Sequence, residues 1–310
     1  MSKLAFIFPG QGSQKLGMLS AIETETNIVN DTFVEASDAL GEDLWKICQF
    51  DSEKLNQTEY TQPILLTSSV ALWRVWCDQT GPKPAMMAGH SLGEYSALVC
   101  ANSINFADAI NLVAARGRFM QSAVPAGTGG MAAILGLDDQ QVVDACAKAS
   151  DGDIVQAVNF NCPGQVVIAG HQAAVERAIE LCKEAGAKRA MPLPVSVPSH
   201  CDLMQPAAEK LQEMLASVTI KAPEIKILHN VDVAPHEDAN AIRKALVSQL
   251  YKPVRWTETI QTMAQSGLQS FVECGPGRVL AGLQKRIAPD TQALNFDSIE
   301  TLTAAIAAIQ

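Results

Sequence analysis

The sequence predicts an α/β fold in which a small domain of ferredoxin-like order is inserted into a larger α/β domain. Three observations lead to this prediction. Short apolar runs end at sharp turns and are followed by segments of helical spacing, which is typical of layered α/β folds. A segment rich in glycine, Val124–Gly130, interrupts this pattern. A strand–helix–strand–strand–helix–strand order then follows, which is the order of a ferredoxin-like unit.

The first part of the chain alternates between buried strands and helices. Leu4–Phe8 is an apolar run that ends at Pro9-Gly10, as expected of a buried strand. Pro82 and Pro84 break the chain before a second apolar run at Ala85–Gly89. Apolar residues recur at helical spacing in four further segments, which we expect to be helices: Ile28–Ala39, Gln62–Trp76, Glu94–Cys100 and Phe106–Gln121.

The small domain is expected over residues 125–197. Its first helix is expected at Asp138–Ala149, with Asp138 as the N-cap, and its second at Ala173–Ala185, ended by Gly186. Four strands are expected around these helices: Met131–Leu135, Ile154–Val158, Val166–Ala169 and Lys188–Leu193.

The larger domain is then expected to comprise residues 1–124 and 198–310. Its second part holds two strand candidates and two helix candidates: Ile225–Asn230, Ser270–Glu273, Ala239–Leu250 and Thr301–Ile309.

Composition excludes several classes of protein. The 310 residues include 33 acidic and 23 basic side chains, a formal net charge of −10, and 48% are hydrophobic. Such a chain is globular, and it lacks the basic footprint that nucleic acid or a membrane surface requires. The eight cysteines are scattered without zinc spacing, and the N-terminal apolar run is too short for a signal peptide. We therefore expect a cytoplasmic protein with reduced thiols, no metal and no cofactor.

Gly89-His90-Ser91-Leu92-Gly93 matches the G-x-S-x-G pattern of a nucleophilic serine. In that pattern the serine occupies a tight turn between a strand and a helix, and the glycines permit a bend that a Cβ would block. The residue after the serine can offer its N–H to an oxyanion. The motif alone is also compatible with an ordinary turn.

A nucleophilic serine needs a base, and five histidines are available: His90, His171, His200, His229 and His236. His200 is the preferred candidate because it follows the expected junction between the two domains, where clefts tend to form. His229 is its main rival, and His200 could equally be a buried structural histidine. Spacing singles out no carboxylate to orient the base among Asp108, Asp138 and Asp153.

Five motifs in this order resemble the malonyl-CoA:acyl carrier protein transacylases, the discrete bacterial acyltransferases of type II fatty acid synthesis. The motifs span essentially the whole chain: Gly10-Gln11-Gly12-Ser13-Gln14, Gly89-His90-Ser91-Leu92-Gly93-Glu94, Arg116-Gly117, Pro198-Ser199-His200 and Gly275-Pro276-Gly277.

The resemblance implies an α/β-hydrolase-like large domain with a parallel sheet, interrupted by the ferredoxin-like domain. It implies transfer of malonyl from coenzyme A to the phosphopantetheine thiol of acyl carrier protein through a malonyl-serine. Ser91 matches the nucleophile and His200 the base, and the Gln249 carbonyl matches the group that orients this base. Two residues match the oxyanion hole and one the ligand of the malonyl carboxylate: Gln11, Leu92 and Arg116.

Several further expectations accompany this resemblance. Arg118 lies about 200° from Arg116 around a helix, so only one of the two is expected to face the pocket. Lys188-Arg189 and Lys285-Arg286 are expected to dock the carrier. The partners are then malonyl-CoA and acyl carrier protein, with no nucleic acid and no membrane, and we expect a monomer. A serine esterase or thioesterase and a non-catalytic carrier-binding module are the alternatives.

Overall fold

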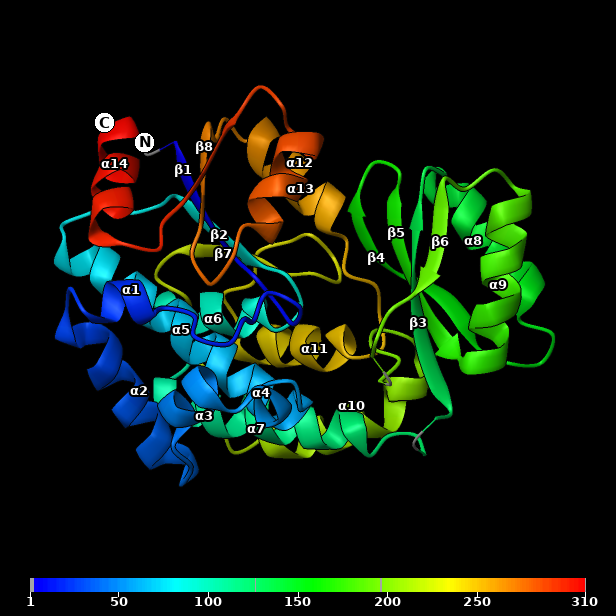
Figure 1. Cartoon of the computed structure of the whole chain (residues 1–310), viewed down its shortest axis with the longest axis horizontal. Helices are drawn as coiled ribbons and strands as arrows, with labels where there is room; N and C mark the ends of the chain where they lie inside the picture. Colours follow the sequence, from blue (N-terminus) through cyan, green and yellow to red (C-terminus); the bar gives the residue numbers. More distant parts are fainter. Residues whose placement is uncertain (1–2, 126, 196, 310) are drawn as a thin grey trace.

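The chain forms two separate β-sheets, each covered by its own helices (Figure 1). The computed structural model describes residues 3–125, 127–195 and 197–309. One sheet has five parallel strands and the other has four antiparallel strands. The predicted fold class is confirmed: an α/β-hydrolase-like parallel sheet combined with a ferredoxin-like βαββαβ unit.

The five strands of the parallel sheet lie in the order β7-β2-β1-β8-β9. Every residue of the central strand β1 is buried, because helices cover both faces of the sheet. Leu4, Phe6 and Phe8 point into one core, and Ala5 and Ile7 point into another. The strands are β1 (Leu4–Phe8), β2 (Met86–Gly89), β7 (Lys226–Leu228), β8 (Ser270–Glu273) and β9 (Gln292–Asn295).

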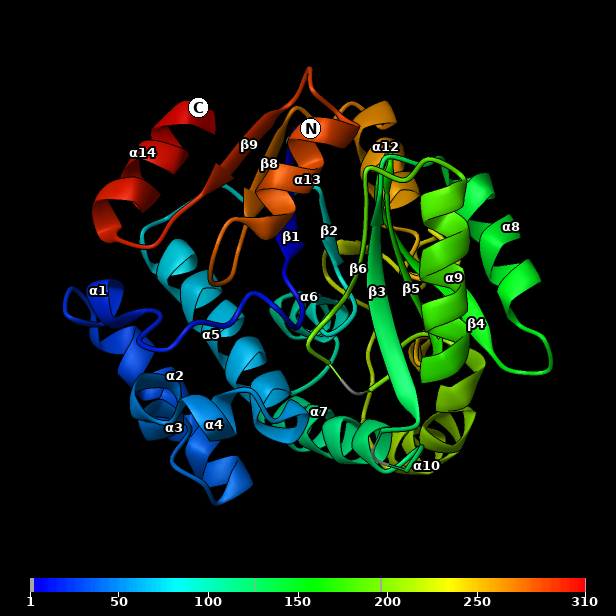
Figure 2. The same cartoon turned by 45° about the vertical axis from the view of Figure 1, so that its right-hand side comes forward.

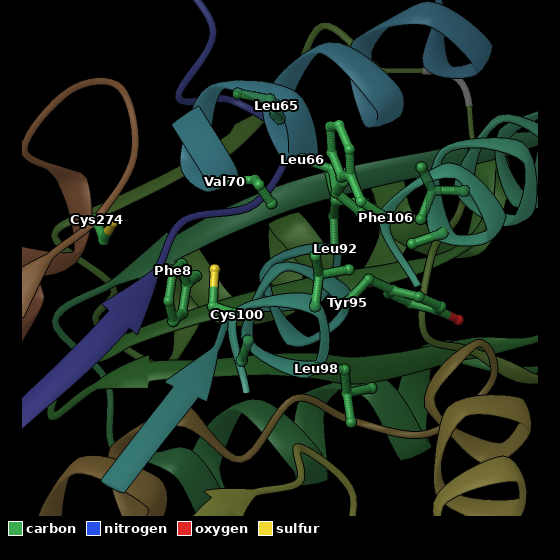
Figure 3. Packing of buried hydrophobic residues seen from close by; sticks show 14 of the residues in the cluster. Phe8, Leu65, Leu66, Val70, Leu92, Tyr95, Leu98, Cys100, Phe106 and Cys274 are labelled. Atoms are coloured by element: carbon green, nitrogen blue, oxygen red, sulfur yellow. The ribbon is translucent and has the colours of Figure 1, made fainter. Parts of the chain in front are cut away.

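Helices from distant parts of the sequence form the larger of these cores. Figure 3 shows Phe8 among side chains of α5 and α6, with Leu92 and Leu98 in the same cluster. The second core lies on the opposite face of β1, under α12 and α13. The helices of this domain are α1 (Ser20–Glu23), α2 (Asn27–Leu40), α3 (Leu44–Phe50), α4 (Ser52–Leu55), α5 (Thr58–Asp78), α6 (Gly93–Cys100), α7 (Phe106–Gln121), η1 (Asp202–Met204), α10 (Gln205–Leu215), α11 (Ala239–Gln249), α12 (Trp256–Gln265), α13 (Val279–Ile287) and α14 (Ile299–Ile309).

The small sheet has the strand order β4-β5-β3-β6, the arrangement of a ferredoxin-like unit (Figure 2). One face packs on its two helices, and the other packs against Cys201 and Leu203 of the returning chain. Asp138 caps the first helix as predicted, in a capping box with Gln141. The elements are β3 (Gly129–Leu135), α8 (Asp139–Ala149), β4 (Val155–Cys162), β5 (Gln165–His171), α9 (Gln172–Glu184) and β6 (Arg189–Pro192).

Three neighbouring parallel strands bring their carboxyl ends to one edge of the large sheet. The loop with Gln11 follows β1, the turn with Ser91 follows β2, and His229 and Asn230 follow β7. Ligand sites in such sheets form at this edge. No helix in the described part of the chain is both long and apolar enough to cross a membrane.

Candidate active site

A cavity of ≈ 700 Å³ lies at this edge of the large sheet, with walls from both domains. Gln11, Ser91, Arg116 and His200 line it, and β3 and β4 of the small sheet also contribute to its wall. The cavity therefore brings together residues that lie far apart in the sequence.

Ser91 occupies a strained turn between β2 and α6. Its φ of 51° lies in the left-handed region that non-glycine residues rarely adopt. Two glycines make this turn possible, because a Cβ on Gly89 would lie 1.9 Å from the Gly93 carbonyl carbon. A Cβ on Gly93 would lie 2.0 Å from the Phe8 carbonyl oxygen. This geometry is that of a nucleophile elbow.

His200 hydrogen-bonds to Ser91 and to Gln249 through its two ring nitrogens. Nε2 lies 2.8 Å from Ser91 Oγ, and Nδ1 lies 2.6 Å from the Gln249 carbonyl oxygen. A carbonyl only accepts, so Nδ1 carries the proton and Nε2 is left to accept from the serine hydroxyl. Burial and the nearby positive charge of Arg116 lower the pKa of His200 to about 3, so its ring is neutral near pH 7.

The residues predicted to form an oxyanion hole flank Ser91. Leu92 is the N-cap of α6, and Gln11 lies in the loop after the adjacent strand β1. Within the described residues, neither backbone N–H donates a hydrogen bond, so both donors are available to a ligand.

Arg116 is a buried cation beside the serine. Its Nη2 atom lies 3.3 Å from Ser91 Oγ and 3.0 Å from Gln249 Oε1, and its Nη1 atom lies 2.7 Å from Gln62 Oε1. The guanidinium carbon lies 5.4 Å from the centroid of the Tyr95 ring. Among the described residues no carboxylate forms an ion pair with Arg116. Burying an unpaired cation is costly, so this position is suited to an anionic ligand.

The expectation that only one arginine of this helix faces the pocket is wrong. Arg118 also lines the cavity, where its side chain is exposed while that of Arg116 is buried. Helical spacing makes the two side chains leave the helix in different directions, but a long arginine side chain can still reach the rim of so large a cavity.

Each of the other four histidines has its hydrogen bond or ion pair elsewhere, and none of these described side chains forms a hydrogen bond to Ser91 Oγ. His229 is buried and hydrogen-bonds through Nδ1 to Glu94 at 2.7 Å, and His90 Nε2 lies 2.8 Å from Asn161 Oδ1. His171 is the N-cap residue of α9, and His236 pairs with Asp232.

The three aspartates considered as orienting groups serve elsewhere. Asp138 caps α8, Asp153 pairs with Arg177, and Asp108 lies in the first turn of α7. No carboxylate hydrogen-bonds to His200 among the residues that the structure describes.

Sequence reasoning missed three polar residues that support the site. Gln62 binds Arg116, Asn230 Oδ1 accepts from the Ser91 backbone N–H at 2.8 Å, and Glu94 binds both Asn230 and Gln249. Only Glu94 carried a signal, as the last residue of the serine motif. Across residues 3–125, 127–195 and 197–309, no group of three or more His, Cys, Asp or Glu side chains could hold a metal ion.

A serine with a neutral histidine, two free N–H donors and a buried cation can carry out acyl transfer to and from the serine. The family model described as acyl transferase domain matches residues 5–298. The malonyl CoA-acyl carrier protein transacylase of Salmonella typhimurium is 58% identical over 307 residues, covering 99% of each chain. The chain belongs to the malonyl CoA-acyl carrier protein transacylase family of acyltransferases.

Two solved structures share the fold closely. The malonyl CoA-acyl carrier protein transacylase of Coxiella burnetii has a TM-score of 0.98 at 49% identity, covering 99% of this chain and 98% of that chain. A malonyl-transacylase in complex with a type II PKS acyl-carrier protein also has a TM-score of 0.98, at 54% identity. This match covers 99% of this chain and 100% of that chain.

Proposed function

We propose that the protein transfers malonyl from coenzyme A to the phosphopantetheine thiol of acyl carrier protein, in fatty acid synthesis, through a malonyl ester of Ser91. The names of its relatives support these substrates. The observation that carries the chemistry is the placement of Ser91 Oγ, 2.8 Å from His200 Nε2 and 3.3 Å from Arg116 Nη2.

In the first half-reaction, His200 Nε2 takes the proton of Ser91 as Oγ attacks the thioester carbonyl. The N–H groups of Gln11 and Leu92 stabilise the oxyanion, each contributing about 3–4 kcal/mol in comparable sites. The C–S bond then breaks, and the coenzyme A sulfur leaves with the proton from His200. In the second half-reaction, the carrier thiol gives its proton to His200 and attacks the ester, and the proton returns to Ser91.

Arg116 selects malonyl in this scheme. The free carboxylate of a malonyl ester on Ser91 lies only a few bonds from Oγ, within reach of the guanidinium. A planar guanidinium binds a carboxylate through two parallel hydrogen bonds. Acetyl has no such group and leaves the buried cation unpaired, so acetyl-CoA is the poorer substrate.

The carrier is proposed to dock on a basic groove next to the junction of the two sheets. Lys188, Arg189 and Arg286 line this groove of ≈ 570 Å³. Arg286 extends from α13 and donates to Gln165 Oε1 at 2.7 Å and to the Pro163 carbonyl at 3.1 Å. The groove thus contains both residues of the pair Lys188-Arg189 and one residue, Arg286, of the pair Lys285-Arg286. Such local cations can attract an acidic carrier despite the net charge of −10.

Two further expectations belong to the same proposal. Among the described residues, the hydrophobic cluster between the small sheet and its two helices contains only residues of the segment 125–197, which supports a division into residues 1–124 with 198–310 and residues 125–197. The eight cysteines are all free, as suits a reducing compartment such as the cytoplasm.

Incubation with malonyl-CoA, with and without acyl carrier protein, tests the function. The proposal predicts malonyl-carrier as the main product when the carrier is present, and little free malonate in its absence. Free malonate as the main product in both incubations would instead identify a thioesterase.

A further inference from the structure

Glu94 is a fully buried carboxylate three residues after Ser91, and it accepts three hydrogen bonds. Oε1 accepts from His229 Nδ1 at 2.7 Å, and Oε2 accepts from the Asn230 backbone N–H at 3.0 Å and from Gln249 Nε2 at 2.9 Å. A carboxylate is costly to bury unless its oxygens are paired, and both of these are.

The Gln249 side chain connects this carboxylate to Arg116. Gln249 Nε2 donates to Glu94 Oε2 and to the Ser91 carbonyl, both at 2.9 Å, and Gln249 Oε1 accepts from Arg116 Nη2 at 3.0 Å. An amide can be turned either way, but a carboxylate only accepts hydrogen bonds. Glu94 therefore fixes the amide with its nitrogen toward itself and its oxygen toward Arg116.

A second amide links Glu94 to the serine turn. Asn230 donates its backbone N–H to Glu94, while its side chain accepts from the Ser91 N–H at 2.8 Å and donates to the Gly89 carbonyl at 2.6 Å. This link affects the serine turn, and hence malonyl and acetyl transfer alike. The link through Gln249 also reaches the Ser91 carbonyl, but in addition it holds Arg116, whose contact matters most for acyl groups that carry a carboxylate.

The indirect connection also suits the charge of the site. Burial lowers the pKa of the Arg116 guanidinium, and the negative charge of Glu94 acts in the opposite direction. A carboxylate bound directly to Arg116 would occupy the donors that recognise an acyl carboxylate. A carboxylate one amide away balances the cation, while the guanidinium itself hydrogen-bonds, within the described chain, only to neutral oxygens, which compete less strongly than a carboxylate with an anionic ligand.

We propose that Glu94 is a positioning residue for malonyl selection, which orients Gln249 and thereby holds Arg116 ready for the free carboxylate of the acyl group. The inference rests on the proposed function, in which Arg116 binds malonyl.

Glu94→Gln tests this role with minimal change in shape. The new amide can keep its oxygen toward Asn230 and Gln249 and turn its NH2 toward His229, whose Nδ1 accepts in the other tautomer. The variant thus keeps the shape of the side chain but loses the charge that balances Arg116, and an amide that can turn either way no longer fixes the orientation of the Gln249 amide. We expect kcat/KM for malonyl loading to fall by about tenfold and that for acetyl loading by less than about threefold.

Glu273→Gln is the matched control. Glu273 is equally buried and accepts the backbone N–H groups of Leu280 and Ala281 at 3.1 and 2.7 Å, with no hydrogen bond to Arg116. Its replacement should lower the melting temperature and leave the malonyl-to-acetyl ratio at the wild-type value. A merely structural role of Glu94 would give this same pattern, so an unchanged ratio in Glu94→Gln overturns the proposal.

Two further variants complete the test. If Glu94→Gln does not fold, Gln249→Met removes the same link but keeps the backbone carbonyl on His200. It should lower the malonyl-to-acetyl ratio of kcat/KM, and an unchanged ratio overturns the proposal.

Arg116→Ala, measured in parallel, distinguishes a failure of the role of Glu94 from a failure of the proposed function. If Arg116→Ala lowers the ratio and neither other variant does, only the role of Glu94 is wrong. If Arg116→Ala leaves it unchanged, the proposed function loses its selecting residue and the role of Glu94 falls with it.

Discussion

His200 Nδ1 lies 2.6 Å from the backbone carbonyl oxygen of Gln249, the position at which many serine hydrolases have a carboxylate. The carbonyl fixes the tautomer of the histidine without adding a negative charge. An aspartate there would repel the malonyl carboxylate that the proposed function brings beside Arg116. This contact also explains why no aspartate between Ser91 and His200 could be singled out from the sequence.

The first prediction concerns the pH dependence of loading. The pKa of His200 is lowered to about 3, so the ring remains neutral and able to accept a proton at every pH well above that value. The single-turnover rate of Ser91 acylation should vary by less than about twofold between pH 5.5 and 7.5 in rapid-quench measurements. A histidine of ordinary pKa would be neutral in only about a tenth of molecules at pH 5.5. A half-maximal rate near pH 6.5 would contradict the account.

A second prediction concerns substrate selection by Arg116. Arg116→Ala should lower kcat/KM for malonyl-CoA by about 100-fold or more, because a charge-assisted pair of hydrogen bonds is lost. The value for acetyl-CoA should fall by less than about tenfold. Arg116→Lys keeps the charge but not the paired donors, so it should give intermediate values. Equal losses for both substrates in steady-state assays would argue against this role.

Gly93 provides a test of the serine turn itself. In Gly93→Ala the added Cβ would lie 2.0 Å from the Phe8 carbonyl oxygen, so β1 and α6 must move apart. We expect the free energy of unfolding to fall by about 3 kcal/mol or more in urea titrations. Gly282→Ala in α13 is the control, because its Cβ would meet no heavy atom within 4 Å. That change should be neutral or slightly stabilising, and similar losses in both variants would refute the explanation.

Carrier docking is tested by charge reversal in the basic groove. Arg189→Glu should raise the KM for acyl carrier protein by about tenfold at low ionic strength and leave loading from malonyl-CoA unchanged. Lys210→Glu is the control, because Lys210 is exposed on α10 and does not line the groove. If the two reversals have the same effect on the carrier KM, the groove is not the docking surface.

The sequence predicted those parts of the fold and site that depend on local pattern. The bounds of β1, α7 and β8 agree residue for residue with the predicted segments. The site residues were predicted through the motifs, because the serine turn, Arg116 and His200 each lie in a short recognisable segment. Helices α10, α12 and α13 were missed, although each has a buried apolar face.

Other features depend on contacts between distant residues. The hydrogen bonds of Glu94 span 135 to 155 residues of sequence. Gln62 and Asn230 are ordinary polar residues until the fold places them against Arg116 and Ser91. Their roles arise because buried polar groups must find partners, and no spacing rule identifies those partners in advance.

Covalent labelling of Ser91 tests the central claim most directly. Wild-type protein mixed with radioactive malonyl-CoA in the absence of carrier should retain close to one label per chain after rapid gel filtration and release it on addition of carrier thiol. Ser91→Ala should retain no label, although it should still fold and bind malonyl-CoA without covalent attachment. Stoichiometric labelling that persists in Ser91→Ala would contradict the account.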